Sequence, residues 1–194
     1  NSGISPIQLV ASNAKAQTIN NSKLKNISEP IFNYQAEFNT VGENIDIIDA
    51  LKKELYSQLK LINLLTLDLK KGARVMLIKN LDIDAGLVNG SMGVINAVTR
   101  DSVTVTFDNS VIQQITPYEW GLELFDCKVK VKQIPIILAY AITIHKSISL
   151  TLSSAVMDLA DCFCNHMVYV AMSRVKSIDG LLLKSFNHRK ITVN

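Results

Sequence analysis

The stretch that decides the fold is Ala139–Leu152, AYAITIHKSISLTL, which is answered downstream by Tyr169–Ser177, YVAMSRVKS. The apolar, alternating run Ile137–Ile144 predicts a buried strand. Polar side chains gather at the end of that strand: Thr143, His145, Lys146, Ser147 and Ser149. A buried strand that delivers hydroxyl, imidazole and ammonium groups at one end is a common way to build a phosphate-binding edge.

The downstream stretch places Arg174 in a predicted helix, Met167–Val175, beside small residues. A guanidinium at this position could reach a phosphate held by a neighbouring domain. The alternative is an ordinary ion pair with a carboxylate such as Asp158 or Asp161.

Both stretches resemble motifs V and VI of the Pif family of DNA helicases, in the RecD-like branch of superfamily 1. The family text is close to A-x-A-I-S-I-H-K-S-Q-G-x-T-L and Y-V-A-L-S-R-A. Upstream, Leu69–Gly93, LKKGARVMLIKNLDIDAGLVNGSMG, is similar to the family's L-K-x-G-A-Q-V-M-L-x-K-N-L and G-L-V-N-G-x-x-G. The resemblance covers residues 66–186 well and residues 1–40 weakly, where IQLVASNAKAQTINNSKL has the pattern of motif IV.

The resemblance implies an α/β fold: a second RecA-like domain of the P-loop NTPase type with an inserted small SH3-like β-barrel. The expected RecA-like domain (2A) is discontinuous, residues 1–70 and 129–194, and the expected barrel (2B) is residues 71–128. The residues themselves agree with a barrel, because short β-type runs are separated by tight-turn sequences. These runs are Val75–Ile78, Gly93–Val98, Val103–Phe107 and Val111–Ile115.

Outside the barrel the patterns predict further elements. Apolar spacing favours an amphipathic helix over Asp46–Leu65 whose lysines face solvent, and a helix that begins at Asn13. The run Ile136–Ile144, which contains the decisive strand, is expected to be central in its sheet, and Gly180–Leu183 is expected at an edge. The other expected strands are Ile7–Val10, Phe32–Phe38 and Val156–Leu159, and Trp120 is expected to be a core anchor.

The resemblance also implies which residues contact DNA. By position in the motifs, these are Thr143, His145, Lys146, Ser147 and Asn13. Hydroxyl and imidazole groups suit phosphates because they fix register without reading sequence. The residues alone also allow purely structural interpretations. Asn13 or Ser12 could cap a helix, and the polar side chains at the strand end could simply face solvent.

On the nucleotide side, the resemblance makes Arg174 the catalytic arginine finger, with Ser149 and Ser173 beside the nucleotide. The chain departs from the family here. The family's Gln-Gly after HKS is Ile148-Ser149, and its Gly-Gln before the YVA helix is His166-Met167. These departures remove two amides and two glycines from this side of the site.

No metal site is expected. Cys162, Cys164 and His166 form a short run, but 164 would leave the face that 162 and 166 share on a helix, and no fourth ligand is obvious. Free thiols fit the three cysteines and a reducing compartment.

Composition sets further limits. The chain has 194 residues, 48% of them apolar, a net charge of +3 and only 6% aromatic residues. It is mildly basic, which permits nucleic-acid binding, whereas dense base stacking is excluded. No segment is apolar enough to span a bilayer, and the start lacks a secretion signal pattern, so we expect no membrane partner.

The sequence contains no G-x-x-x-x-G-K-[ST] motif, so this chain alone should neither hold nor hydrolyse ATP. We expect the C-terminal module of an ATP-dependent DNA helicase, moving 5′ to 3′, in replication or repair. In the full-length protein it would use ATP and Mg²⁺, and its partners would be single-stranded DNA, the N-terminal RecA-like domain, and primase or other replication proteins. The expected location is intracellular: nucleus, cytoplasm or a viral replication site. The alternative is a catalytically degenerate, DNA-binding or scaffold subunit of a replication complex.

Overall fold

The computed structural model describes residues 6–162 and 166–186, and the chain divides into two compact units. Unit 1 is Asn1–Asn26 with Leu138–Asn194, and unit 2 is Ile27–Ile137. This division differs from the expected domains, 1–70 with 129–194 and 71–128. The cause is strand pairing, because strands between residues 32 and 69 and strands between residues 118 and 133 belong to the same unit.

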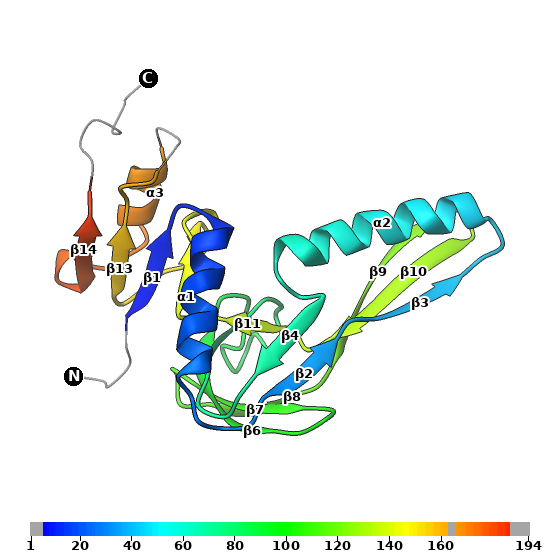
Figure 1. The fold of residues 1–194 in the computed structure, drawn as a ribbon, viewed down its shortest axis with the longest axis horizontal. Coiled ribbons are helices and arrows are strands. Elements are labelled where there is room, and N and C mark those ends of the chain that lie inside the picture. Colours follow the sequence, from blue (N-terminus) through cyan, green and yellow to red (C-terminus); the bar gives the residue numbers. More distant parts are fainter. Residues whose placement is uncertain (1–5, 163–165, 187–194) are drawn as a thin grey trace. The chain divides into compact units, whose positions relative to one another are not determined.

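Unit 1 is built on a parallel sheet with the strand order β12-β1-β13-β14 (Figure 1). These strands are β12 (Ala141–Thr143), β1 (Ile7–Val10), β13 (Ala155–Asp158) and β14 (Leu181–Ser185). Val10 stands opposite Thr143 on one side and Asp158 on the other, so these three residues mark the carboxyl edge of the sheet. β14 lies at the edge of this order, as expected for the last strand.

The prediction of one central strand over Ile136–Ile144 is wrong. The run divides into β11 (Ile136–Leu138), which belongs to another sheet, and β12, which ends the strand order of the described parallel sheet. The side chain of Asn20 binds the chain where β12 begins. Its Oδ1 accepts hydrogen bonds from the backbone N–H groups of Tyr140 (3.1 Å) and Ala141 (2.8 Å), while the carbonyl of Tyr140 accepts from the N–H of Gln8 of β1 (2.9 Å).

Helix α1 (Asn13–Lys25) follows β1 directly, and Ser12 is its N-cap. The Ser12 Oγ accepts a hydrogen bond from the N–H of Lys15 at 3.3 Å, which settles the choice between the two candidate caps. Helix α1 packs on the sheet through Ala16, against Val10 and Ala141. Helix α3 (Met167–Met172) is shorter than the expected 167–175, so Arg174 lies beyond its end rather than within it.

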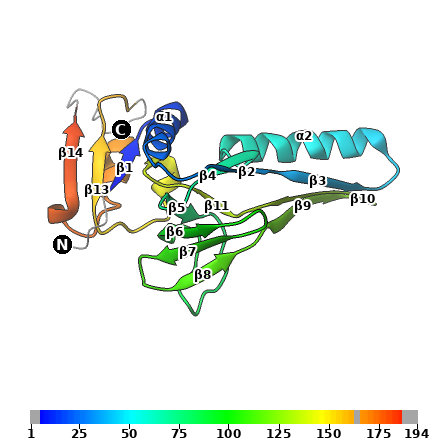
Figure 2. The ribbon, with the colours of Figure 1, turned by 60° about the horizontal axis from the view of Figure 1, so that its bottom comes forward.

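Unit 2 contains a five-stranded sheet with the order β11-β5-β6-β7-β8 (Figure 2). Its strands after β11 are β5 (Arg74–Leu77), β6 (Met92–Val98), β7 (Val103–Phe107) and β8 (Ile112–Ile115), which pair antiparallel in sequence order. All four were expected from the sequence within a residue or two. The SH3-like identity of this region stays a prediction.

Two glycines shape the β5–β6 region for different reasons. Gly90 has φ +96°, a turn conformation that side chains disfavour. Gly93 lies within β6 and does not have a positive φ. A Cβ at Gly93 would lie 2.5 Å from the carbonyl oxygen of Thr106, so glycine is needed there for the close approach of β7.

The rest of unit 2 is a three-stranded antiparallel sheet, β3-β10-β9, on which helix α2 (Ile45–Leu61) packs. β3 is Glu37–Val41, β9 is Tyr118–Leu124 and β10 is Cys127–Gln133, and a separate strand pair joins β2 (Phe32–Gln35) to β4 (Thr66–Leu69). Leu55 and Leu59 are buried on α2 while its lysines are exposed, as predicted. β4, β9 and β10 were not foreseen.

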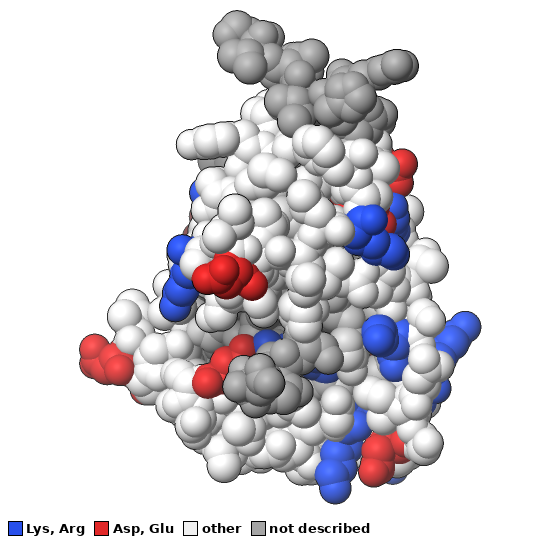
Figure 3. Space-filling view, turned by 90° about the vertical axis from the view of Figure 1, so that its left-hand side faces the viewer, with Lys and Arg blue, Asp and Glu red and all other residues white. Residues whose placement is uncertain are grey.

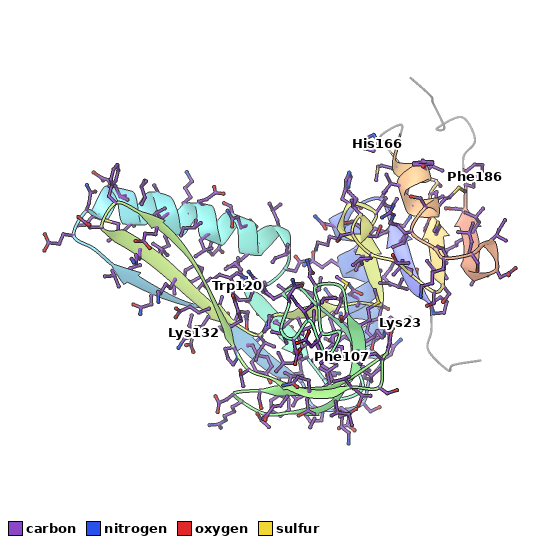
Figure 4. The ribbon with its side chains drawn as sticks, turned by 180° about the vertical axis from the view of Figure 1, so that it is seen from behind. Lys23, Phe107, Trp120, Lys132, His166 and Phe186 are labelled. Carbon is purple, nitrogen blue, oxygen red and sulfur yellow. The ribbon has the colours of Figure 1, made fainter. Side chains whose placement is uncertain are left out.

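Trp120 and Lys132 are on opposite faces of this sheet (Figure 4), since Trp120 stands opposite the buried Val131. Trp120 is only half-buried and meets the Tyr118 ring edge-on at 5.1 Å, so it is a boundary residue rather than a deep core anchor. No helix in the described part of the chain is long and apolar enough to cross a membrane.

Candidate nucleic-acid and nucleotide site

The carboxyl end of β12 runs into a 3₁₀ turn, His145–Ser147, whose side chains stabilise the turn itself. The Thr143 Oγ1 accepts a hydrogen bond from the N–H of Lys146 at 3.3 Å, and the Ser147 hydroxyl donates to the carbonyl of Ile144 at 2.7 Å. Thr143 and Ser147 are both buried. Two of the four motif V residues that were predicted to bind DNA therefore serve the turn in this structure.

His145 and Lys146 are the accessible members of the turn. His145 is exposed and Lys146 is half-buried. Burial lowers the pKa of the Lys146 ammonium from its ordinary value, because the charged form loses hydration. Within residues 6–162 and 166–186, no carboxylate lies within ion-pair distance of Lys146. A phosphate bound next to this ammonium would stabilise its charged form.

Asn13 reaches the same edge of the sheet from a different strand. It begins α1 just after β1, and the N–H of Ile144 donates to the carbonyl of Val10 at 3.0 Å, which ties the two strand ends together. The Asn13 side chain is exposed and Ser12 performs the capping. Asn13 is thus available for a contact at the edge where His145 lies, as parallel strands would place it.

Arg174 follows the C-cap of α3, Ser173, and its guanidinium is held by its own unit. Its Nε donates to the carbonyl of Val170 at 3.2 Å and its Nη1 donates to the carbonyl of Ile148. The expected alternative, an ion pair with Asp158 or Asp161, is not formed. The structure therefore brings Arg174 directly to the segment that follows the His145–Ser147 turn.

The segments that carry the two motifs are also joined through their backbones. The N–H of Leu152 donates to the carbonyl of Arg174 at 2.8 Å, and the N–H of Lys176 donates to the carbonyl of Leu152 at 3.0 Å. Ser173 accepts from Arg174 Nη2 at 3.0 Å and donates to the carbonyl of Val170 at 3.0 Å. Ser149 is exposed two residues beyond the turn. Arg174 and Ser173 thus share one hydrogen-bonded region, and the roles of all three predicted nucleotide-side residues stay predictions.

An ionic cluster at the same sheet edge was missed from the sequence. Asp158, which ends β13, is buried and accepts a hydrogen bond from the Ser185 hydroxyl, while Lys15 Nζ lies 3.0 Å from it and 2.7 Å from Asp161. The Ser185 hydrogen bond, followed by Lys15, lowers the pKa of the Asp158 carboxyl. Hydrogen bonds to Asp161 and then Asp158 raise the pKa of Lys15. The sequence signal that could have revealed this cluster is Asp158, a charged residue at the end of an apolar run.

The residues of the cysteine run differ in exposure. Cys162 is buried, His166 is exposed, and Cys164 lies outside the described residues. Among the residues that are described, no three His, Cys, Asp or Glu side chains gather as metal ligands would.

On the face of the molecule drawn in Figure 3, the Lys and Arg side chains are not gathered in one patch. Figure 3, which views the molecule from the β14 side of Figure 1, shows Lys and Arg side chains separated by uncharged surface and by Asp and Glu. For the described residues on this face, contact with a phosphate backbone would have to rest on a few placed groups rather than a continuous basic stripe.

Comparison with known proteins gives consistent matches. The family model for the 2B domain of the DNA helicase Pif1 matches residues 54–98. The ATP-dependent DNA helicase PIF1 of Danio rerio is 32% identical over 201 residues, which cover 99% of this chain and 29% of the relative. The Xenopus laevis PIF1 helicase is 36% identical over 132 residues, covering 66% of this chain and 21% of the relative. The chain therefore spans less than a third of these relatives.

Solved structures agree in fold over the chain. The Pif1 helicase from Candida albicans superposes with a TM-score of 0.82 at 30% identity, covering 100% of this chain and 48% of that one. Bacteroides Pif1 bound to single-stranded DNA gives a TM-score of 0.70 at 26% identity, covering 100% of this chain and 44% of that one. With the motif-bearing parallel sheet already described, these matches show that the chain belongs to the Pif1 family of helicases, as a segment with the family's RecA-like α/β fold.

Proposed function

We propose that the full-length protein is an ATP-dependent DNA helicase in which unit 1 supplies single-strand contacts and the arginine finger. The similarity to PIF1 helicases supports the activity, and the Bacteroides Pif1 structure with single-stranded DNA supports the ligand. Movement from 5′ to 3′ is part of this proposal by family resemblance.

One observation carries the proposal. The guanidinium of Arg174 donates to the carbonyl of Ile148, the residue that directly follows the His145–Ser147 turn. The group proposed to meet nucleotide therefore contacts the residue next to the turn proposed to meet DNA, within one unit.

The hydrogen-bond partners of Arg174 are compatible with a role as an arginine finger. The described acceptors of Arg174 are neutral carbonyl and hydroxyl oxygens. A phosphate oxygen forms a shorter and stronger charge-assisted hydrogen bond with a guanidinium than a neutral oxygen does. Arg174 can therefore exchange these carbonyls for a γ-phosphate presented by another domain. ATP supplies the phosphoryl group, and Arg174 would neutralise its developing charge.

Replacement of the arginine tests the finger. We expect Arg174→Ala in the full-length protein to lower the ATPase kcat by about 10³-fold while single-strand affinity is retained. The matched control is Arg100→Ala, which removes an exposed arginine from the β6–β7 turn of unit 2. ATP turnover that survives Arg174→Ala unchanged would exclude the finger role.

A salt titration tests the DNA side. If Lys146 neutralises one phosphate, Lys146→Ala should reduce the slope of log affinity against log salt for a single-stranded oligonucleotide by about one. Lys60→Ala, an exposed lysine on α2, is the matched control and should leave the slope unchanged. Equal slopes for wild type and Lys146→Ala would remove Lys146 from the interface.

A second candidate function is a helicase-like scaffold or DNA-binding subunit without turnover. Ile148 favours it, because an apolar side chain that is 54% exposed stands where the family has a glutamine amide. Purified full-length protein that binds the oligonucleotide but lacks DNA-stimulated ATPase activity would support the scaffold and contradict the helicase.

A further inference from the structure

The end of unit 2 formed by Val41–Asp46 and Leu124–Cys127, which we name the tip, is a surface that the proposed helicase site does not use. It lies where β3 ends, α2 begins and the β9–β10 hairpin turns (Figure 1). A Cβ at Gly42 would lie 2.8 Å from Cys127 Sγ, and that thiol contacts the carbonyl of Asn44 at 3.7 Å. The two segments are therefore packed together without a gap.

The tip exposes large apolar side chains together. Phe125 is 78% exposed and Ile45 is 72% exposed, and the exposed Leu124 stands opposite Cys127, whose thiol meets the residue before Ile45. Isolated exposed apolar residues are ordinary, but several on two segments packed together mark an interaction surface. Such a cluster would gain from removal from water by a partner.

The backbone conformation of Phe125 indicates that this residue is not there to stabilise the fold. Phe125 and Asp126 link β9 to β10, with Leu124 opposite Cys127, and Phe125 has φ +52°. The first position of a two-residue hairpin turn with positive φ favours glycine. An exposed phenylalanine there adds strain and little burial, a combination that points to a role outside the fold.

The charge of the tip restricts what can cover it. Glu43, Asp46 and Asp126 are exposed, and none of them forms an ion pair within the described part of the chain. The nearby Glu123 is already paired with Lys128 at 2.9 Å. An acidic surface repels phosphates, and it repels the tip of a second copy in a symmetric contact. Nucleic acid and tip-to-tip dimerisation are therefore disfavoured.

We propose that the tip docks a separate protein through a segment of that protein that carries basic and apolar side chains. Phe125 is the anchor, with Ile45 and Leu124 around it, and the carboxylates pair with the basic side chains. Aromatic anchors surrounded by complementary charge are the usual centres of such interfaces.

Site-specific crosslinking tests this proposal. A benzophenone amino acid at position 125 of the full-length protein, activated by light in the cells that make it, should crosslink to one other protein. The crosslinked segment should carry net positive charge and apolar residues. Crosslinks confined to the helicase itself or to nucleic acid, an acidic crosslinked segment, or no crosslink would overturn the proposal.

A binding measurement with the purified crosslinked partner completes the test. Phe125→Gly should weaken its affinity at least tenfold and should keep or raise the melting temperature, because glycine accepts φ +52°. Ile112→Ala, which removes a 63% exposed side chain from β8, should leave the affinity unchanged. Equal affinity for Phe125→Gly and wild type would overturn the anchor role, and ATPase measurements on the same variants keep this result separate from the helicase proposal.

Discussion

Both units bury polar side chains, but the two topologies use them differently. In unit 1, Thr143 and Asp158 are buried at the carboxyl edge of a parallel sheet, beside the turn that carries His145 and Lys146. In unit 2, Gln133 and Tyr34 are buried between antiparallel strands and bond to backbone groups. Parallel strands bring their carboxyl ends together at one edge, so unit 1 concentrates polar groups where a ligand can reach them.

The comparison teaches that burial of a polar group does not define its role. The groups of unit 2 form hydrogen bonds to backbone atoms inside that unit, so their loss should lower stability. The groups of unit 1 adjoin exposed or half-buried donors, so their loss should change ligand binding as well. Three stability measurements sharpen this contrast, and they follow in order of expected effect.

Gln133→Leu in unit 2 should have the largest effect on stability. Gln133 Nε2 donates to the carbonyls of Tyr34 (3.1 Å) and Leu64 (3.0 Å), and its Oε1 accepts from the N–H of Ile134 (2.8 Å). Leucine removes all three of these hydrogen bonds from the buried backbone groups, which we expect to lower the free energy of unfolding by about 3 kcal/mol. Urea unfolding followed by the fluorescence of Trp120, the single tryptophan and a residue of unit 2, measures it.

The matched control is Gln113→Leu, which changes an exposed glutamine on the neighbouring sheet of the same unit. It should shift the urea midpoint little. If Gln133→Leu shifted the midpoint no more than Gln113→Leu, the buried amide would not hold the strands of unit 2 together.

Asp158→Asn in unit 1 should lower stability less, by about 1–2 kcal/mol near neutral pH. The amide keeps the shape and can still meet Ser185, but it loses the charge that pairs with Lys15 at 3.0 Å. Hydrogen exchange of the β13 amides measures the loss in unit 1 separately from unit 2.

The pH dependence of this difference identifies the carboxylate. The folded pKa of Asp158 is lowered from 3.8, so its stabilisation is fully present above 3.8 and is lost as pH falls toward the folded value. The gap in stability between wild type and Asp158→Asn should therefore close in acid. A gap that is constant down to the acid limit would show that the charge of Asp158 is not what stabilises β13.

Local sequence patterns predicted more strands of the five-stranded sheet of unit 2 than of its three-stranded sheet, β3-β10-β9. Val103–Phe107 alternates cleanly and was expected as a strand. Tyr118–Leu124 and Cys127–Gln133 were not, although the alternation of valine and lysine in CKVKVKQ is a strand pattern and the two strands form a local hairpin. The pairing of β10 with β3, which is distant in sequence, is what a single-sequence pattern does not report.

At the candidate site, the sequence and family resemblance supplied residue types but not their partners. They selected Arg174 and the His145–Ser147 turn, which the structure joins through the carbonyl of Ile148. They could not show that Thr143 and Ser147 turn inward to hold the turn, because that depends on backbone geometry. Lys15 was overlooked because its carboxylate partners lie more than a hundred residues away along the chain.

Tyr34→Phe should give the smallest loss, about 1 kcal/mol near neutral pH, since one phenol hydroxyl is removed. The Tyr34 hydroxyl donates to the carbonyl of Thr99 and lies 3.4 Å from that of Ser102, which fastens β2 to the β6–β7 turn. Trp120 fluorescence in urea, measured near neutral pH and again in alkali, follows unit 2 in both proteins.

Alkali separates the role of the hydroxyl from general loss of packing. Burial raises the pKa of Tyr34 from 10.0 to about 12, so the stabilisation by the neutral phenol is complete below pH 10.0 and is lost as pH rises toward 12. Lysines titrate in both proteins, so the difference between wild type and Tyr34→Phe isolates this one group. The difference should shrink above pH 10. If it stayed constant, the phenol would be as accessible to hydroxide in the folded chain as in the unfolded one, and Tyr34 would be a surface group rather than a buried fastener of unit 2.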